Sequence, residues 1–225
     1  MTDTTDAVSA PATSSPALPA RARVSLRAAM GLPERPDFVL ALPTGWVRRA
    51  VDEGSRDDLQ ASVRGRLLQA HRPDLYARLR PLLDEAFTAM AAADVIAMFT
   101  PAAGDDEALA LPASMVASTR TATGENLDPL VGALIREGGA TPLLGDKRFL
   151  RFERETRRSL DGEDYLATEI GYLTPIPGSR RRQALQLTVS IARPSGTAAD
   201  DEAVVLMKTL FDLSVSSLRW EAPGA

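Results

Sequence analysis

The chain contains no cysteine, only two lysines and a single histidine. Without cysteine, it can form neither disulfides nor thiolate metal sites, and it has no thiol nucleophile. His71 is then the only side chain that could serve a catalytic triad or a histidine metal site. Because Pro73 interrupts a helical pattern just beyond it, we expect His71 to lie at an exposed corner. We therefore predict no catalytic histidine.

The usual short motifs of catalysis and ligand binding are also missing. There is no G-x-S-x-G sequence, which hydrolases use to present a serine. Residues 139–147 have one residue too many between their glycines for a phosphate loop, so we interpret them as a turn before a strand. The acidic residues 105–107 lack the alternating ligands and the glycine of a calcium loop. We expect no catalytic residue, no cofactor and no metal.

Charge and hydropathy indicate which partners and which cellular location to expect. The net charge of −4 disfavours a dedicated nucleic-acid binder, which usually carries a basic excess. The first residues lack the basic and apolar runs of a secretory signal, and no later segment approaches about 20 apolar residues. We expect a cytoplasmic protein with no nucleic-acid partner and no membrane span.

The composition divides the chain into a tail and one domain. Residues 1–30 are rich in Ala, Thr, Ser and Pro, and we predict a disordered tail and linker. The whole chain is 44 % hydrophobic, which is enough for one sizeable core within residues 31–225. We predict a single α+β domain there, with a helical insert at about 57–92.

Three helical segments are indicated by apolar residues at helical spacing. The insert at 57–92 predicts an αα-hairpin with its corner at residues 71–74, and Pro81 predicts a further kink or break. A shorter helix follows Asn126 or Asp128, either of which could cap it, and ends at residues 138–139. The last helix runs from about 201 to 220 with a broad apolar face.

Strands are predicted on both sides of the helical insert. Residues 38–46 indicate a buried strand that Pro43 stops, and residues 94–100 and 113–119 indicate an antiparallel pair. Three meander strands follow, over residues 147–156, 165–174 and 184–192. In the last strand, apolar residues alternate with polar ones that should point toward water. These polar residues are Gln186, Thr188 and Ser190.

This order of elements resembles the PsbP-like, Mog-type α/β fold. The matching segments are residues 38–46, which end in Pro-Thr-Gly-Trp, the meander over 147–191, and the helix over 201–220. The insert departs from the smaller members and resembles uncharacterised actinobacterial proteins of this kind. The resemblance implies an antiparallel sheet with a C-terminal helix packed on it. Members are mostly binding and assembly proteins, but none of their functional motifs can be placed on residues here.

Charged residues of the meander offer two candidate sites. Five carboxylates interleave with arginines, an arrangement typical of cross-strand ion pairs rather than of acid–base catalysis. The carboxylates are Glu153, Glu155, Glu163, Asp164 and Glu169, and the arginines are Arg151, Arg154, Arg157 and Arg158. Arg180, Arg181 and Arg182 occupy a predicted hairpin tip, with Arg157 and Arg158 placed near them across the sheet. This group could contact an acidic partner, a phosphate or an anionic lipid headgroup, or could be a solvated turn.

Three functional hypotheses remain from the sequence. The leading one is a non-enzymatic protein-binding or adaptor domain that uses the polar sheet face or the arginine-rich hairpin. The second is a small-molecule binder with a pocket between the sheet and the helices, where Trp46 and Tyr172 could stack a ligand, although Trp46 fits a core anchor better. The third is an enzyme that uses carboxylates and arginines. An accessory or chaperone-like role in a secretion system is a further alternative.

Overall fold

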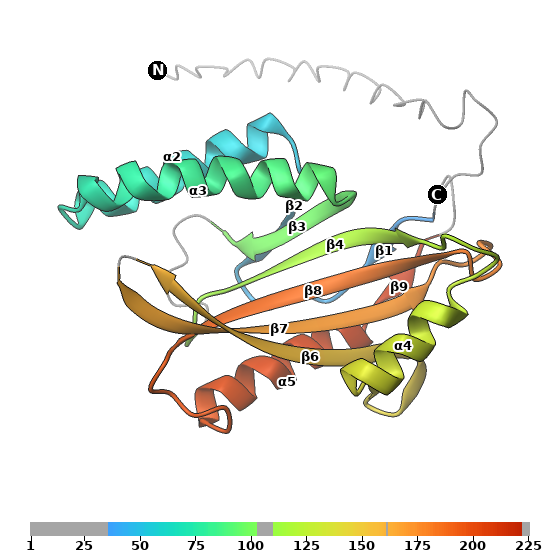
Figure 1. Cartoon of the computed structure of the whole chain (residues 1–225). Coiled ribbons are helices and arrows are strands. Elements are labelled where there is room, and N and C mark those ends of the chain that lie inside the picture. The colour runs from blue at the N-terminus through green and yellow to red at the C-terminus, as the bar shows by residue number, and fades with distance from the viewer. Residues whose placement is uncertain (1–35, 103–109, 161, 222–225) are drawn as a thin grey trace, which may run out of the picture. The chain divides into compact units, whose positions relative to one another are not determined.

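The computed structural model describes residues 36–102, 110–160 and 162–221. These residues belong to one compact unit, Arg35–Ala225. The predicted tail over 1–30 and the acidic residues 105–107 lie outside the described residues. The fold is a mixed α+β fold built on an antiparallel sheet, as the sequence predicts (Figure 1).

Seven strands form the main sheet in the order β2-β3-β4-β8-β7-β6-β5, and each neighbouring pair is antiparallel. The strands are β2 (Trp46–Arg49), β3 (Val95–Pro101), β4 (Ala113–Thr121), β5 (Thr141–Leu143), β6 (Asp146–Leu160), β7 (Glu163–Pro175) and β8 (Gln183–Pro194). The predicted β3–β4 hairpin and the β6–β7–β8 meander are confirmed, and every one of these strands except β3 is longer than the sequence indicated. The short β5 was missed because it has only three residues.

Four helices accompany the sheet, namely α2 (Glu53–Gln69), α3 (Pro73–Ala92), α4 (Asp128–Gly138) and α5 (Glu202–Ser216). α2 and α3 form the predicted hairpin between β2 and β3, and α3 contacts β3. Of the kink or break expected at Pro81, the break is wrong, since α3 continues through it. Pro81 lies on the exposed side of the helix, where water can hydrogen-bond the carbonyl that the proline leaves unpaired. None of the described helices is both long enough and apolar enough to span a membrane.

The strand predicted over 38–46 is in fact two strands in different sheets. β1 (Phe38–Val39) pairs with β9 (Arg219–Trp220), and Phe38 lies opposite Trp220. The chain then turns at Gly45, whose φ is 76°, and Trp46 opens β2. The alternating apolar residues indicated burial correctly. They could not show that the proline and glycine divide the segment between two ladders.

One face of the main sheet is closed by α5. Val204, Met207, Phe211 and Val215 of α5 are buried against this face, as are alternate residues of β8 and β7. Trp46 meets Phe211 edge-to-face with ring centroids 5.2 Å apart. Trp46 and Tyr172 are both buried in this core. The hypothesis that they stack a ligand is therefore wrong, because side chains fill the space between them and α5.

On the opposite face, α4 covers one end of the strands (Figure 1). Leu127, Leu173 and Ala184 form a small second core under this helix. Its N-cap is Leu127, so neither predicted side-chain cap occupies that position, although Asn126 accepts a hydrogen bond from the Asp128 N–H. The helix ends at Gly139 with a φ of 61°, as the sequence predicts.

Candidate binding site

The face of the sheet opposite α5, which we call the open face, is set by the register of four central strands. In an antiparallel sheet, directly paired residues project to the same side. The predicted outward residues of β8 are therefore joined by alternate residues of its neighbours. The open face comprises Ser114, Val116, Ser118 and Arg120 of β4, Gln186, Thr188 and Ser190 of β8, Tyr165, Ala167, Glu169 and Gly171 of β7, and Phe152, Arg154 and Arg158 of β6.

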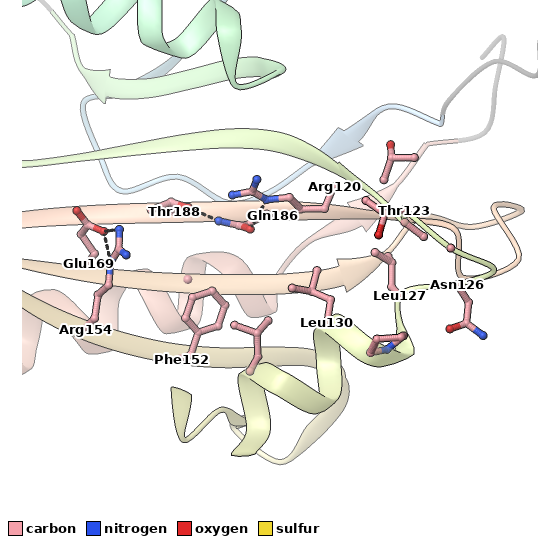
Figure 2. A pocket seen from close by; sticks show the side chains of 16 residues that line it. Arg120, Thr123, Asn126, Leu127, Leu130, Phe152, Arg154, Glu169, Gln186 and Thr188 are labelled. Atoms are coloured by element: carbon pink, nitrogen blue, oxygen red, sulfur yellow. Dashed lines mark hydrogen bonds and ion pairs between the residues drawn. The ribbon is translucent and has the colours of Figure 1, made fainter. Parts of the chain in front are cut away.

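A cleft of about 620 Å³ lies between α4 and the open face. Its apolar wall comes from Leu127, Leu130 and Leu134 on the α4 side and from Phe152 on β6. Figure 2 shows Leu130 and Phe152 on one side of this cleft and the polar residues of β8 on the other. Cavities of about 300–1,000 Å³ are typical of ligand sites. The cleft is thus large enough for a small molecule or for one anchoring side chain of a partner.

The floor of the cleft depends on a glycine in the middle of a strand. Gly171 lies opposite Phe152 in the ladder, and the Phe152 ring occupies the space where a Cβ of residue 171 would project. Gly in a strand interior is unfavourable unless something approaches the backbone closely. Here the aromatic ring makes that close approach. Gly171 therefore shapes the cleft by allowing Phe152 to pack down onto β7.

The polar wall of the cleft is a chain of hydrogen bonds between β4 and β8. Arg120 Nε donates to Oε1 of Gln186 at 2.7 Å, and Gln186 Nε2 donates to Oγ1 of Thr188 at 3.0 Å. These bonds fix the amide of Gln186 across the strands (Figure 2). Gln186 is a neutral acceptor, and within the described ranges Arg120 forms no ion pair with a carboxylate.

Beyond the cleft, two arginines of β6 converge on one carboxylate of β7. Arg154 Nε donates to Oε2 of Glu169 at 2.6 Å, and Arg158 Nη2 donates to Oε1 at 3.4 Å. The Glu169 side chain is 15 % exposed, whereas those of Arg154 and Arg158 are 72 % and 52 % exposed. The carboxylate is therefore largely covered while both guanidinium groups remain accessible to a ligand.

A second hollow of about 420 Å³ continues along the same face. It is lined by Ser114, Tyr165 and Ser190, and it shares Glu169 with the cleft. The charged residues that line the two hollows are Arg120, Arg154 and Arg158, with Glu169 as the one carboxylate among them. The two hollows thus form a track with a local excess of positive charge, on a chain whose net charge is −4.

The predicted arginine patch is not brought together. Arg182 precedes the first residue of β8, whereas Arg158 lies in register with Tyr165, which pairs with Pro194 at the other end of β8. Eleven residues of strand separate these positions, or about 36 Å at 3.3 Å per residue. Arg157 lies beside Arg158 and approaches Asp164 at 3.9 Å.

Arg180, Arg181 and Arg182 are all exposed, but the backbone of their turn has a structural role. The carbonyl oxygens of Arg181 and Arg182 accept hydrogen bonds from the N–H groups of Leu127 and Ala122, at 2.9 and 2.8 Å. The Arg181 side chain pairs with Asp128 at the start of α4. The β7–β8 turn therefore holds the segment that positions α4 over the cleft.

The predicted cross-strand ion pairs are confirmed, but they are divided between the two faces. Arg154 and Glu169 pair on the open face, whereas Arg151, Glu153 and Glu155 lie on the face that α5 covers. There, Asp212 of α5 accepts hydrogen bonds from Arg151 Nε at 2.8 Å and from the Tyr172 hydroxyl at 2.6 Å. Burial raises the pKa of Tyr172, and the Asp212 carboxylate raises it further. The phenol therefore stays protonated and donating.

The single histidine lies at a helix corner. His71 lies exposed at the corner between α2 and α3, as predicted, with a φ of 56°. No group of three potential metal ligands occurs among the described residues.

The sequence did not reveal the cleft beside α4, although one residue pointed to it. Gly171 interrupts an apolar strand, which indicates a close approach to the backbone.

Comparisons with known proteins find only distant structural similarity. No family model matches the chain, and no curated protein matches it. Among solved structures, LpqN of Mycobacterium tuberculosis, which is involved in cell envelope biogenesis, is similar at a TM-score of 0.38 and 15 % identity, covering 85 % of this chain and 87 % of that one. A structure from Bacteroides thetaiotaomicron is similar at a TM-score of 0.38 and 11 % identity over 84 % of this chain, which spans only 46 % of that protein.

Proposed function

We propose that this protein is a non-enzymatic binding domain whose open face receives an acidic segment of a partner protein. The observation that carries the proposal is the charge of the track, because its lining holds Arg120, Arg154 and Arg158 but one carboxylate, Glu169. An acidic segment would gain hydrogen bonds from accessible guanidinium groups. The apolar wall beside Phe152 would hold one aliphatic or aromatic anchor of the same segment.

Small side chains along the track support an extended partner. Ser114, Ser190 and Ala167 project little from the strands, so a peptide backbone can lie close to the sheet. A compact anion would use one arginine pair, whereas a segment with spaced carboxylates can reach Arg120 and Arg158 together. The length of the track therefore favours a peptide over a single small anion.

The proposal is tested with the full chain and two labelled peptides, one alternating glutamate with leucine and one alternating lysine with leucine. We expect the glutamate peptide alone to bind in fluorescence anisotropy, with an affinity that falls as salt increases. The variant R154E/R158E should weaken binding about tenfold or more, since it replaces attraction by repulsion.

The matched control is R64E/R80E, which makes the same charge change at exposed positions of the α2–α3 hairpin. It should leave binding unchanged apart from a small long-range effect of net charge. Equal weakening by both variants, or equal binding of both peptides, would contradict a specific site. Circular dichroism of each variant checks that loss of binding is not loss of fold.

A second candidate function is the binding of a small amphipathic anion, and the volume of the cleft supports it. Such a ligand would place an apolar group between Leu130 and Phe152 and an acidic group near Arg154. Phe152→Ala should abolish small-molecule binding, whereas an extended peptide would keep its contacts with the arginines. Medium-chain fatty acids are suitable probes, with competition against the glutamate peptide as the readout.

The remaining expectations from the sequence stay proposals. They are membership of the PsbP-like, Mog-type family, a cytoplasmic location, the absence of a nucleic-acid partner and the absence of catalysis. An accessory role in a secretion system also stays a proposal, and the identity of a peptide that binds the open face would test it.

A further inference from the structure

The C-terminal helix α5 is apolar on two opposite sides. One side carries the residues buried on the sheet, centred on Met207 and Phe211. The other side faces outward and exposes three large aliphatic side chains. Val205, Leu206 and Leu213 are 47 %, 63 % and 56 % exposed. A helix that is apolar on both sides normally has a partner on both.

The outward residues form one stripe, which we call the outer stripe. Its members are Glu202, Val205, Leu206, Thr209, Leu213 and Ser216. At 100° per residue, they fall within about 100° of the helix circumference. The steps from Leu206 to Thr209, Leu213 and Ser216 are three, four and three residues. This is the spacing with which one helix packs along another.

The charged residues of α5 do not interrupt the outer stripe. After Glu202, the helix contains only Lys208 and Asp212. Lys208 Nζ donates to Glu153 of β6 at 2.6 Å, and Asp212 accepts from Arg151 and Tyr172. Both charges thus pair with residues of β6 and β7. The centre of the outer stripe is left without charge, so a strongly charged partner would gain nothing from it.

The outer stripe is self-complementary when two copies run antiparallel. With Thr209 at the two-fold axis, Leu213 of one copy meets Val205 and Leu206 of the other, and Ser216 meets Glu202. The two Glu202 carboxylates are then at opposite ends of the contact, whereas a parallel pair would place them side by side. Antiparallel helices also oppose their dipoles favourably. An anionic membrane surface is a poor alternative, because Asp200, Asp201 and Glu202 begin this helix.

We infer that α5 forms a two-fold symmetric contact with α5 of a second copy, through Val205, Leu206 and Leu213, with Thr209 at the axis. The contact is isologous, as is usual in homodimers. A helix of 15 residues is about 22 Å long, so the interface is small and the dimer is weak. The open face lies on the other side of the sheet and stays accessible in this dimer.

The test begins with sedimentation of the full chain at concentrations from about 5 to about 500 µM, a range suited to a weak interface. We expect a monomer–dimer equilibrium that the variants Leu206→Glu and Leu213→Glu shift to monomer. Both positions are exposed, so the variants should keep the fold. Leu82→Glu, at an equally apolar exposed position of α3, should leave the equilibrium unchanged.

Disulfide cross-linking tests the antiparallel geometry of the contact. Because the chain has no native cysteine, each variant carries a single thiol. Thr209→Cys should form an intermolecular disulfide on mild oxidation, because the two thiols meet at the axis. Ser216→Cys should not, since antiparallel pairing separates the two thiols by about 21 Å. A monomer at every concentration, a dimer that both charged variants leave intact, or preferential cross-linking through Ser216→Cys would each overturn the inference.

Discussion

The ring of Phe152 occupies the space that a Cβ of Gly171 would need on the neighbouring strand. A Cβ built at residue 171 would lie only 2.1 Å from Cζ of Phe152 and 2.4 Å from Cε2. Real Cβ atoms do not approach other heavy atoms so closely, so the two residues fit only as a pair. The contact sets the depth of the cleft on the open face.

Gly171→Ala should therefore displace Phe152 into the cleft. We expect a cost of about 1–3 kcal/mol in the free energy of unfolding, as for other overpacked sites. The Phe152 ring can rotate about its side-chain bonds. The cost in the free energy of unfolding should therefore lie at the lower end of this range if the cleft has room for the displaced ring. Chemical denaturation measures the cost, and peptide anisotropy should show weakened binding.

The double variant Gly171→Ala with Phe152→Leu provides the control. The smaller side chain leaves room for the new methyl group, so the cost of Gly171→Ala should be lower in this background. Equal costs in the two backgrounds would mean that Phe152 is not what constrains residue 171.

Tyr172 and Asp212 should be energetically coupled across the interface between β7 and α5. Tyr172→Phe removes a buried hydrogen bond to a carboxylate, which is worth about 1.5–3 kcal/mol. In an Asp212→Ala background, the same change should cost much less, since the acceptor is already absent. A double-mutant cycle by urea denaturation measures the coupling, and additive costs would contradict it.

Acid should destabilise the protein partly through Glu153. Burial by itself would raise the pKa of Glu153, but hydrogen bonds from Lys208 and Arg151 lower it below its ordinary value of 4.5. Because the folded-state pKa is depressed, the unfolded chain binds the proton first. The stabilisation is complete above pH 4.5 and is lost as the pH falls through the lowered value.

Glu153→Gln should make this acid-side loss of stability shallower. Urea midpoints between pH 7 and pH 3, an interval that spans the ordinary carboxyl values, measure the slope for each protein. Asp37 contributes in the same direction, since Arg48 and the Phe38 N–H lower its pKa against the opposing effect of burial. If the variant and the native chain lose stability in parallel, Glu153 does not contribute to the acid sensitivity.

Arg193 should be sensitive to the loss of its partner, because it is the only buried charged residue in the described part of the chain. It is 3 % exposed, and it donates hydrogen bonds to Glu155 and to the carbonyl of Thr197. Glu155→Ala leaves the guanidinium group buried without its carboxylate, which costs about 3–5 kcal/mol for a fully buried pair. Glu155 is 41 % exposed, so water screens the pair and we expect a cost below that range.

Removing the charge of Arg193 as well tests whether the unpaired buried guanidinium group causes the loss of stability. Glu155→Leu combined with Arg193→Met replaces both charges with apolar side chains, and should cost less than Glu155→Ala alone. Thermal unfolding of the variants ranks them directly. If the double variant is the less stable, the packing of Arg193 and its bond to Thr197 outweigh the charge.

The regular alternation of apolar and polar residues in β8 allowed the buried face of the sheet to be predicted. Leu185, Leu187, Val189 and Ile191 alternate with polar residues, so burial on one face follows from the two-residue period of a strand. The same logic found the apolar inner face of α5. It failed over residues 38–46, where a proline and a glycine send neighbouring residues to two different sheets. It also failed at Pro81, because a solvent-facing proline need not end a helix.

The candidate site was harder to predict because its residues come from four strands and a helix. Arg120, Phe152, Glu169 and Gln186 are far apart in sequence, and only the register of the sheet brings them together. The predicted arginine group shows the same limit. Arg157 and Arg182 both lie near strand ends, but the sequence could not show that these are opposite ends of one meander.

The sequence by itself determined the class of fold, the exposed position of His71 and the absence of thiol chemistry. Each of these follows from local spacing or from composition, which do not depend on distant contacts. Only the tertiary structure decided that Trp46 and Tyr172 are buried, that a cleft lies on the opposite face, and that positive charge gathers there. The physical reason is that burial and local charge depend on which strands pair, and the pairing is set by contacts across the whole domain.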